Sequence, residues 1–141
     1  MISEKTMATR LQEQGLRPTQ QRLLIYRFLL ENPIHPTADT IYAALAPANP
    51  VLSRTTVYNS LHSMEKAGLI RALPADMVEG EFRFDADTSA HGHFYCRGCG
   101  DVFDLPLGQE QLAALCPPSF TAEIGNVLFC GRCAHCSPNM A

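Results

Sequence analysis

The stretch "LSRTTVYNSLHSMEKAG", residues 52–68, has the pattern of an amphipathic helix between a capping serine and a final glycine. Val57, Leu61 and Met64 share one apolar helical face. The other side carries hydroxyls, an amide, a histidine and cations: Arg54, Thr55, Tyr58, Asn59, His62 and Lys66. Such a face suits an ordinary solvated helix. It also suits the major groove of DNA, where amides and arginines reach base edges and hydroxyls reach phosphates.

Three further helices are predicted before this one. Apolar residues at helical spacing predict them over 4–15, 17–32 and 36–50. Thr19 and Thr37 stand at the N-cap positions of the second and third helices. The stop signals are a glycine or a proline in each case, at Gly15, Pro33 and Pro47.

Two short strands are predicted after the polar-faced helix. The segments "LIRALP" (69–74) and "EGEFRFD" (79–85) have strand composition, and "ADMVEG" (75–80) forms the turn between them. Several helices, a polar-faced last helix and a β-hairpin make up a winged helix-turn-helix. Arg71 and Arg83 fall on or near the wing. DNA binding is therefore the leading interpretation of the front half.

Composition and charge bound the class of protein. The 141 residues suffice for one large domain or two small ones, and an apolar content of 46% is enough for real cores. No apolar run approaches the roughly 20 residues of a membrane span. The N-terminus lacks the apolar region of a secretory signal, so we expect a cytoplasmic protein. Residues 1–73 carry eight Lys/Arg and five Asp/Glu, whereas residues 74–141 carry three and nine. This asymmetry suits a polyanion for the first half and cations for the second.

The back half is predicted to be a small α+β module. Residues 86–92 are small and polar, and are expected to form a linker or hinge. Strands are predicted over 93–96, 101–107 and 120–130, and a helix over 108–116. A core this small is marginal by itself, so the module is expected to need a metal or a dimer partner.

Six cysteines offer a metal site in this module. Cys96 and Cys99 form one C-x-x-C pair, and two such pairs can close a tetrahedral zinc site. At the C-terminal end both Cys130–Cys133 and Cys133–Cys136 have the same spacing, so spacing leaves the second pair open. A thiol redox pair is the alternative, although no βαβ context surrounds either motif. Cys116 and the cysteine left over are expected to be unpaired and buried.

Histidines and carboxylates suggest a second, different site. His91 and His93 alternate on an extended segment, so both reach one ion only if the strand is bent or just beginning. Asp85, Asp87 and Asp104 are near in sequence or across a predicted strand pair. Mixed nitrogen and oxygen donors suit Fe²⁺, Mn²⁺, Co²⁺ or Zn²⁺, although lone surface residues of these types are commonly solvated.

Six segments of the chain occur in the order found in a known protein family. They are "GLRPTQQR", "HPTADTIYAAL", "RTTVYNSLHSMEKAGLI", "FRFD", "HGHFYCRGCGDVFDL" and "CAHC". Together they resemble the ferric uptake regulator (Fur) superfamily of bacterial metal-dependent repressors. The resemblance implies a winged-helix DNA-binding domain over 1–85, a hinge over 86–92 and a metal-binding dimerisation domain over 93–141. It also implies a homodimer on a palindromic double-stranded DNA operator, with no enzymatic activity.

The resemblance further implies the residues of each site. The family's terminal pattern G-x-C-x-x-C is "GRCAHC" here, so structural Zn²⁺ falls to Cys96, Cys99, Cys133 and Cys136. The regulatory Fe²⁺ or Mn²⁺ of the peroxide-sensing (PerR-type) members uses three histidines and two aspartates. These map onto His35, Asp85, His91, His93 and Asp104. The polar helix face and the family motifs together point to DNA contacts at Arg17, Arg54, Thr55, Thr56, Tyr58 and Asn59.

The peroxide-sensing members are the nearest match. Iron-uptake repressors typically carry glutamates where this chain has Asp85 and Asp104, and "TVYNSL" is similar to the recognition helix of the peroxide sensors. The implied mechanism is oxidation of His35 or His91 by H₂O₂ at bound Fe²⁺, which releases the metal and ends repression.

Three positions depart from relatives. Asn126 replaces a histidine that many carry, and Gly92 stands where iron-type members often have aspartate, which argues against an additional metal site. Cys130 occupies a position that is usually aromatic. Four apolar residues are assigned to either the core or a dimer interface: Phe103, Leu105, Val127 and Phe129.

Three other functions stay open. An iron- or zinc-uptake repressor would respond reversibly to metal without histidine oxidation. A C-x-x-C thiol redox protein would hold a reducible dithiol and no zinc. A metal chaperone or storage module would show no salt-sensitive DNA binding.

Overall fold

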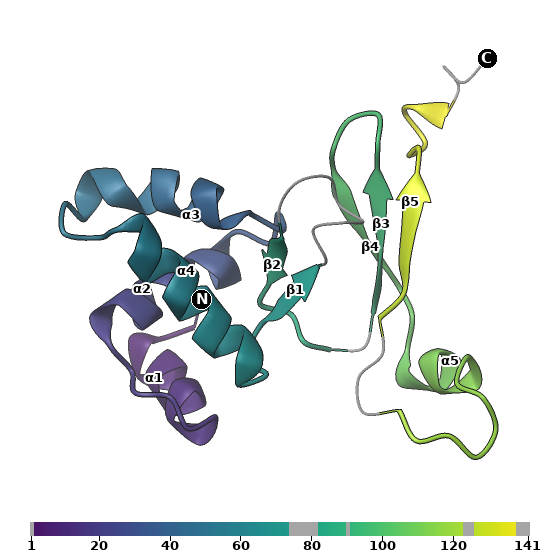
Figure 1. Ribbon diagram of the computed structural model, residues 1–141, viewed down its shortest axis with the longest axis horizontal. Coiled ribbons are helices and arrows are strands. Elements are labelled where there is room, and N and C mark those ends of the chain that lie inside the picture. The colour runs from purple at the N-terminus through teal and green to yellow at the C-terminus, as the bar shows by residue number, and fades with distance from the viewer. Residues whose placement is uncertain (1, 74–81, 90, 123–125, 138–141) are drawn as a thin grey trace. The chain divides into compact units, whose positions relative to one another are not determined.

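The computed structural model describes residues 2–73, 82–89, 91–122 and 126–137 (Figure 1). Four α-helices come first along the chain, and strands with one further α-helix follow. The chain divides into two compact units, Met1–Thr88 and Ser89–Ala141, and each is described by itself. The mixture of helix and sheet confirms the predicted α+β class.

The N-terminal unit contains the four predicted helices. They are α1 (Glu4–Glu13), α2 (Gln20–Glu31), α3 (Ala38–Leu45) and α4 (Arg54–Lys66), with a 3₁₀ turn, η1 (Ala46–Ala48), after α3. A hydroxyl caps each α-helix by accepting a hydrogen bond from a backbone N–H three residues on; these residues are Ser3, Thr19, Thr37 and Ser53. Gly15 and Gly68 follow α1 and α4 with φ of 78° and 81°, a left-handed conformation that ends a helix with little strain in glycine.

A hydrophobic core holds these helices together. The predicted apolar face of α4 is fully inside it, with Val57, Leu61 and Met64 at most 1% exposed. Helix α4 packs on α2 and α3, and α1 packs on α2. Each buried side chain of this size contributes about 2 kcal/mol relative to exposure, so the core suffices to fix α4 with its polar side outward.

A two-stranded antiparallel sheet follows α4. Strand β1 (Arg71–Leu73) pairs with β2 (Arg83–Asp85), so that Arg71 lies opposite Asp85. The predicted strand over 69–74 begins later in the structure, because Leu69 and Ile70 join the helical core instead. The predicted turn over 75–80 lies outside the described residues.

The C-terminal unit is built on a three-stranded sheet. Its strands are β3 (Gly92–Cys96), β4 (Val102–Leu105) and β5 (Leu128–Gly131), in the order β4-β3-β5, with helix α5 (Gln109–Ala114) after β4. Strands β3 and β4 are antiparallel, whereas β3 and β5 are parallel. This register places His93 opposite Asp104 and Cys96 beside Gly131.

The long strand predicted over 120–130 is wrong in its extent. Residues 120–122 and 126–127 lie outside any strand, and residues 123–125 are outside the described part of the chain. Strand β5 can pair only along β3, whose length limits the ladder. Before it, Ser119 has a φ of 68° and the amide of Phe120 donates to the carbonyl of Pro117, which makes a turn there instead.

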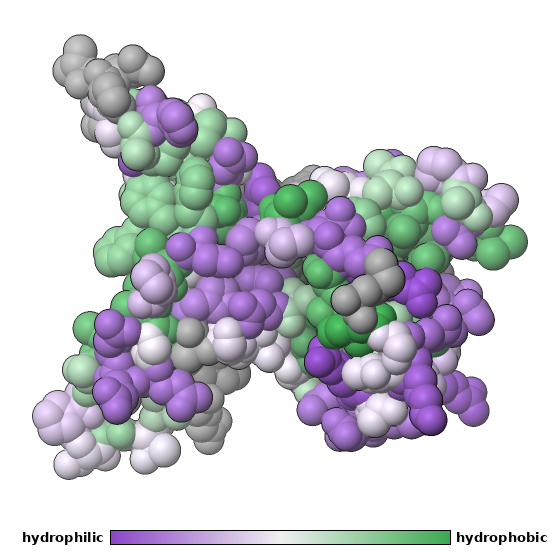
Figure 2. Space-filling view, turned by 180° about the vertical axis from the view of Figure 1, so that it is seen from behind, coloured by the Kyte–Doolittle hydropathy of each residue, from purple (hydrophilic) through white to green (hydrophobic). Residues whose placement is uncertain are grey.

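Few apolar side chains of the C-terminal unit are buried. Among its described residues, only Tyr95 and Cys96 belong to the buried apolar set. Phe103 and Phe129 are 41% and 57% exposed, and Leu105 and Val127 are half-buried. Figure 2 shows apolar surface over the sheet of this unit, at the upper left. None of these four residues belongs to a closed core within the chain.

Candidate metal centres and nucleic-acid interface

Four cysteines meet at one end of the three-stranded sheet. Because β3 and β5 run parallel, their carboxyl ends carry Cys96–Cys99 and Cys133–Cys136 to the same place. One sulfur from each of the four lies within 4.8 Å of the other three. The Sγ atoms of Cys99 and Cys133 are 3.9 Å apart, close to the roughly 3.8 Å edge of a tetrahedron with Zn–S bonds of about 2.3 Å. The donor set and its spacing therefore fit Zn²⁺.

The register left open by spacing is settled by strand pairing. Cys130 lies within β5 beside Tyr95, whereas Cys133 and Cys136 follow the strand and join the cluster. Cys116 follows α5, where its thiol donates to the carbonyl of Phe120 at 3.8 Å. Both Cys116 and Cys130 are half-buried, so the expectation of full burial is wrong for them.

Backbone amides prepare the cluster for thiolates. The amides of Cys133 and Cys99 donate to Cys96 Sγ at 3.3 and 3.5 Å. A side chain at Gly98 would meet Cys136, because a Cβ there lies 2.8 Å from Sγ and 3.0 Å from its Cβ. Gly98 is thus required for the second pair to approach the first.

The pKa values of the clustered thiols are shifted in opposite directions by hydrogen bonds within the cluster. Hydrogen bonding from the Cys133 amide, and less from that of Cys99, lowers the pKa of Cys96 to about 6. The neighbouring sulfurs of Cys96 and Cys133 raise the pKa of Cys136 to about 12. Hydrogen bonds from the Cys136 thiol to these sulfurs are the main cause, with burial and like charge adding to it, and a divalent cation would favour the thiolate form instead.

In the N-terminal unit, His35 and Asp85 form a buried pair. Nε2 of His35 lies 3.3 Å from Oδ2 of Asp85, and both side chains are less than 10% exposed. His35 has a φ of 54°, an uncommon conformation for a residue with a side chain and one that concentrates at functional sites. Arg83 donates to the carbonyl of His35, and the Phe84 amide donates to that of Pro36. Strand β2 therefore holds the strained loop.

In the C-terminal unit, two histidines converge on one carboxylate. Nε2 of His91 and Nε2 of His93 lie 3.5 and 3.6 Å from Oδ1 of Asp104. Strand β3 begins at Gly92, so His91 precedes the strand and is not bound to its alternation. Because β3 begins between His91 and His93, both side chains can reach the same carboxylate. Nδ1 of His91 is 2.8 Å from the carbonyl of Ser89, a contact of the kind that orients metal-binding imidazoles.

Gly92 between the two histidines has little room for a side chain. A Cβ there would lie 2.8 Å from Leu107 Cδ1 and 3.2 Å from the carbonyl of Val127. Asp87, the other carboxylate considered, is exposed, and its amide donates to Oδ1 of Asp85. That hydrogen bond orients the Asp85 carboxylate, and it involves the backbone of Asp87 rather than its side chain.

The exposed side of α4 carries the residues predicted to contact DNA. Thr55 and Asn59 are exposed, and Tyr58 is 49% exposed. Thr56 is half-buried, and its hydroxyl lies 2.9 Å from that of Ser53 within the helix cap.

The predicted DNA-contacting set also contains two arginines, one before α2 and one at the start of α4. Arg17, before α2, is exposed and its carbonyl accepts a hydrogen bond from Arg22. Arg54, at the start of α4, pairs with Asp39 on α3.

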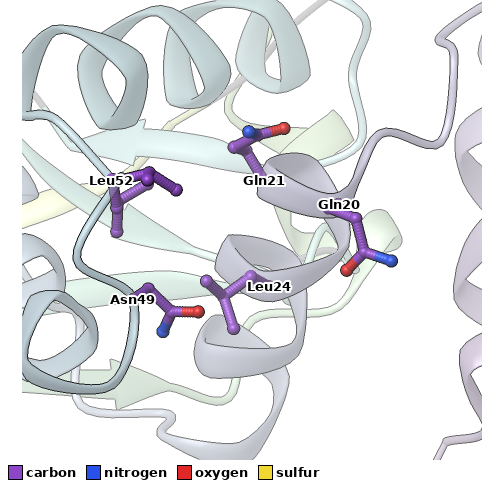
Figure 3. Close-up of a pocket in the computed structure, with 6 residues that line it drawn as sticks. Gln20, Gln21, Leu24, Asn49 and Leu52 are labelled. Carbon is purple, nitrogen blue, oxygen red and sulfur yellow. The ribbon is translucent and has the colours of Figure 1, made fainter.

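A small cavity of about 110 Å³ lies between α2 and the segment that precedes α4 (Figure 3). Gln20, Gln21 and Leu24 approach from α2, and Asn49, Val51 and Leu52 from the segment before α4. The lining is aliphatic and amide, with no titratable group, so this cavity offers no metal-binding or acid–base chemistry.

A sequence model of the ferric uptake regulator family matches residues 13–113, a span that runs from the end of α1 into α5. The chain belongs to the ferric uptake regulator family. The family is one of transcriptional regulators.

Individual relatives agree with this Fur-family assignment. The peroxide-responsive repressor PerR of Staphylococcus saprophyticus is 40% identical over 109 residues, covering 74% of this chain and 72% of that protein. The ferric uptake regulator of Pseudomonas aeruginosa, solved with manganese, superposes with a TM-score of 0.73 at 27% identity, over 91% of this chain and 98% of that one. Fur of Helicobacter pylori, described with three functional metal-binding sites, superposes with a TM-score of 0.76 at 17% identity, over 99% and 97%, and shows the likeness of fold.

Several residues shape the sites of this Fur-family chain in roles that the sequence did not predict, although Arg83 was predicted near the wing. Gly98 admits Cys136, Arg83 holds the His35 loop, and Ser89 orients His91. A glycine between two ligand cysteines was the available signal for the first. The other two contacts involve backbone carbonyls, which leave no mark in a sequence.

In the described ranges, no helix combines the length and hydropathy that crossing a bilayer requires.

Proposed function

We propose that this chain is a metal-dependent, peroxide-responsive transcriptional repressor of the cytoplasm. The observation that carries the proposal is a regulatory site in two halves. Each of the five donors lies within 3.6 Å of another donor of its own unit, His35 with Asp85, and His91 and His93 with Asp104. The three donors of the C-terminal unit, two imidazoles and one carboxylate, are a set that can hold Fe²⁺ by itself, and all five nitrogen and oxygen donors together suit Fe²⁺ or Mn²⁺ with fewer open coordination positions.

Metal binding would couple the halves. An ion that takes donors from both units favours one angle between them over the others, by the difference between its affinities for that arrangement and for the rest. In a homodimer, the selected angle sets the separation of the two α4 helices, which must match the half-sites of a palindromic operator. Loss of the ion removes the selection and weakens repression.

Peroxide would act on the ligands themselves. Bound Fe²⁺ supplies the redox chemistry that activates H₂O₂ beside its ligands. The imidazole of His35 or His91 gains one oxygen atom and the rest of the peroxide leaves as water. An oxidised imidazole is a poor donor, so the site loses affinity for its ion. The chain is consumed in the event, which makes it a sensor and not an enzyme.

The exposed sheet of the C-terminal unit supports the homodimer. Phe103 and Phe129 expose apolar surface in a unit that buries little of its own. A second copy of the same surface, related by a two-fold axis, would cover it. The four clustered cysteines would hold structural Zn²⁺, which stabilises the unit but does not respond to peroxide.

We assign DNA contact to the outer side of α4 and to the start of α2. The proposed residues are Arg17, Arg54, Thr55, Thr56, Tyr58 and Asn59. Asn59 and Thr55 are exposed one helical turn apart, as base-edge contacts require. Arg17, beside the N-terminus of α2, suits a phosphate.

The deciding experiment compares the dimer loaded with Fe²⁺ and with Mn²⁺ before and after H₂O₂. We expect the Fe²⁺ form alone to lose DNA affinity, with one added oxygen on the peptide of His35 or His91 by mass spectrometry. If the Fe²⁺ form keeps its DNA affinity and its histidines stay unmodified, the protein is instead an iron- or zinc-responsive uptake repressor. Metal analysis separates the thiol redox alternative, which requires cysteines free of zinc. Absence of any salt-sensitive DNA binding would leave metal storage or delivery.

A further inference from the structure

The guanidinium of Arg54 is held by two residues of the neighbouring helix. Nη1 donates to Oδ1 of Asp39 at 2.5 Å, and Cζ lies 4.7 Å from the centre of the Tyr42 ring. Asp39 and Tyr42 are on α3, whereas Arg54 is the first residue of α4. A carboxylate at the rim and an aromatic ring at the face restrict a side chain that is otherwise among the most mobile.

The contacts leave much of the guanidinium available. The Arg54 side chain is 61% exposed, and Asp39 takes only one of the several N–H donors in its planar fork. An exposed pair of this kind contributes little to stability. The arrangement is therefore better explained by where it holds the guanidinium than by how much it stabilises the unit.

The direction of the side chain indicates its target. Thr55 and Asn59 occupy the outer side of α4 that we assign to base edges, whereas Arg54 turns toward α3. A helix lying in a major groove has bases below it and phosphate backbones at its flanks. Arg54 is consequently at the flank, where a forked donor matches a phosphate.

We infer that Asp39 and Tyr42 are positioning residues that hold Arg54 for a DNA phosphate at the edge of the groove. The inference rests on the proposed DNA-binding function. A lysine keeps the charge but has neither the fork nor the flat face, and does not replace it.

Five single variants of the full-length, metal-loaded protein test the inference. The probe is a duplex selected from a random-sequence library by the wild-type protein, and affinity is measured over a series of salt concentrations. We expect Arg54→Gln to bind about tenfold more weakly and to lower the salt slope by about one, as loss of one phosphate contact does. Arg54→Lys should keep the slope but lose most of the same affinity.

The variants on α3 distinguish the two explanations, because electrostatics and positioning predict opposite changes in DNA affinity. Asp39→Asn removes a negative charge near DNA, so simple electrostatics predicts tighter binding. Positioning predicts weaker binding by a few-fold, with an unchanged slope. Tyr42→Leu should weaken binding, while Tyr42→Phe, which keeps the ring, should not. Tighter binding by Asp39→Asn, or equal binding by Arg54→Lys and wild type, overturns the inference.

A double variant excludes an effect through folding. Asp39 also lies in the first turn of α3, so its loss can weaken that helix directly. In the Arg54→Gln background, Asp39→Asn should cause no further loss of affinity if it acts through Arg54. A further loss of the same size, or thermal unfolding at lower temperature that tracks affinity across the variants, contradicts the positioning role. If the wild type itself binds no duplex at any salt concentration, the proposed function fails; if it binds and the variants match it, only this inference fails.

Discussion

The two units of this chain reach stability by different routes. The N-terminal unit buries a continuous set of aliphatic side chains from four helices, whereas the described C-terminal unit buries Tyr95 and Cys96 and few others. The second unit instead gathers four sulfurs at one end of its sheet and exposes Phe103 and Phe129. A helical core suffices for the first half, whereas the second half buries so little apolar surface that the metal and the second copy proposed above would be its main sources of stability.

The largest expected effect breaks the C-terminal unit alone. Cys96→Ser should abolish zinc retention and the ordered structure of the sheet, because Cys96 is the sulfur that both backbone amides contact. The helical circular dichroism signal should remain, since the helical core has no part in the cluster. Zinc content and tryptic cleavage mapped by mass spectrometry measure both.

Two cysteines of the same unit provide matched controls for that variant. Cys116→Ser and Cys130→Ser should keep zinc and sheet, since neither sulfur belongs to the cluster. Loss of zinc in either control, or retention in Cys96→Ser, would place the metal elsewhere.

A core substitution should break the N-terminal unit in the opposite way. Leu61 is 1% exposed in the centre of α4, so Leu61→Ala should cost about 2–5 kcal/mol of the free energy of unfolding. Urea denaturation followed by circular dichroism measures that loss, and zinc content should not change. The neighbouring His62→Ala, on the exposed side, should shift stability by no more than about 0.5 kcal/mol. Equal effects of the two substitutions would contradict the packing of α4.

Adding one methyl group at Gly98 tests how closely the two cysteine pairs must approach each other. Gly98→Ala places a Cβ against Cys136, so the second pair must move, and overpacking of this kind costs about 1–3 kcal/mol. Zinc transfer to a chromophoric chelator should be faster than in the wild type. Gly108→Ala is the control, because the nearest atom to its Cβ is the end of the Gln111 side chain at 3.5 Å. Unchanged transfer from Gly98→Ala would show that the pairs have more freedom than the structure gives them.

The smallest effect concerns a helix cap. Thr19→Ala removes the hydroxyl that accepts from the amide of Arg22 and should cost about 1 kcal/mol. Thr9→Ala, in the middle of α1, should be neutral or slightly stabilising because alanine has the higher helix propensity. Thermal unfolding distinguishes the opposite signs, and identical shifts would exclude capping as the cause.

Features that depend on residues close together in the sequence could be predicted, whereas features that depend on distant residues could not. Four helices and three of their caps, Thr19, Thr37 and Ser53, were predicted from the sequence, because a cap or an apolar stripe involves residues three or four apart. The strand over 120–130 was overestimated, because its length depends on β3, which lies about thirty residues earlier. The same non-local pairing decides that Cys136, and not Cys130, joins the cluster.

The donor types and the side of α4 that faces outward were therefore determined by the sequence alone. Their meeting was decided by tertiary structure: His91 and His93 reach one carboxylate because β3 starts between them and pairs with β4. Arg54 likewise takes its direction from α3, through Asp39 and Tyr42. Spacing along a chain specifies local conformation, whereas convergence of distant side chains depends on how the elements pack, which a single sequence encodes only indirectly.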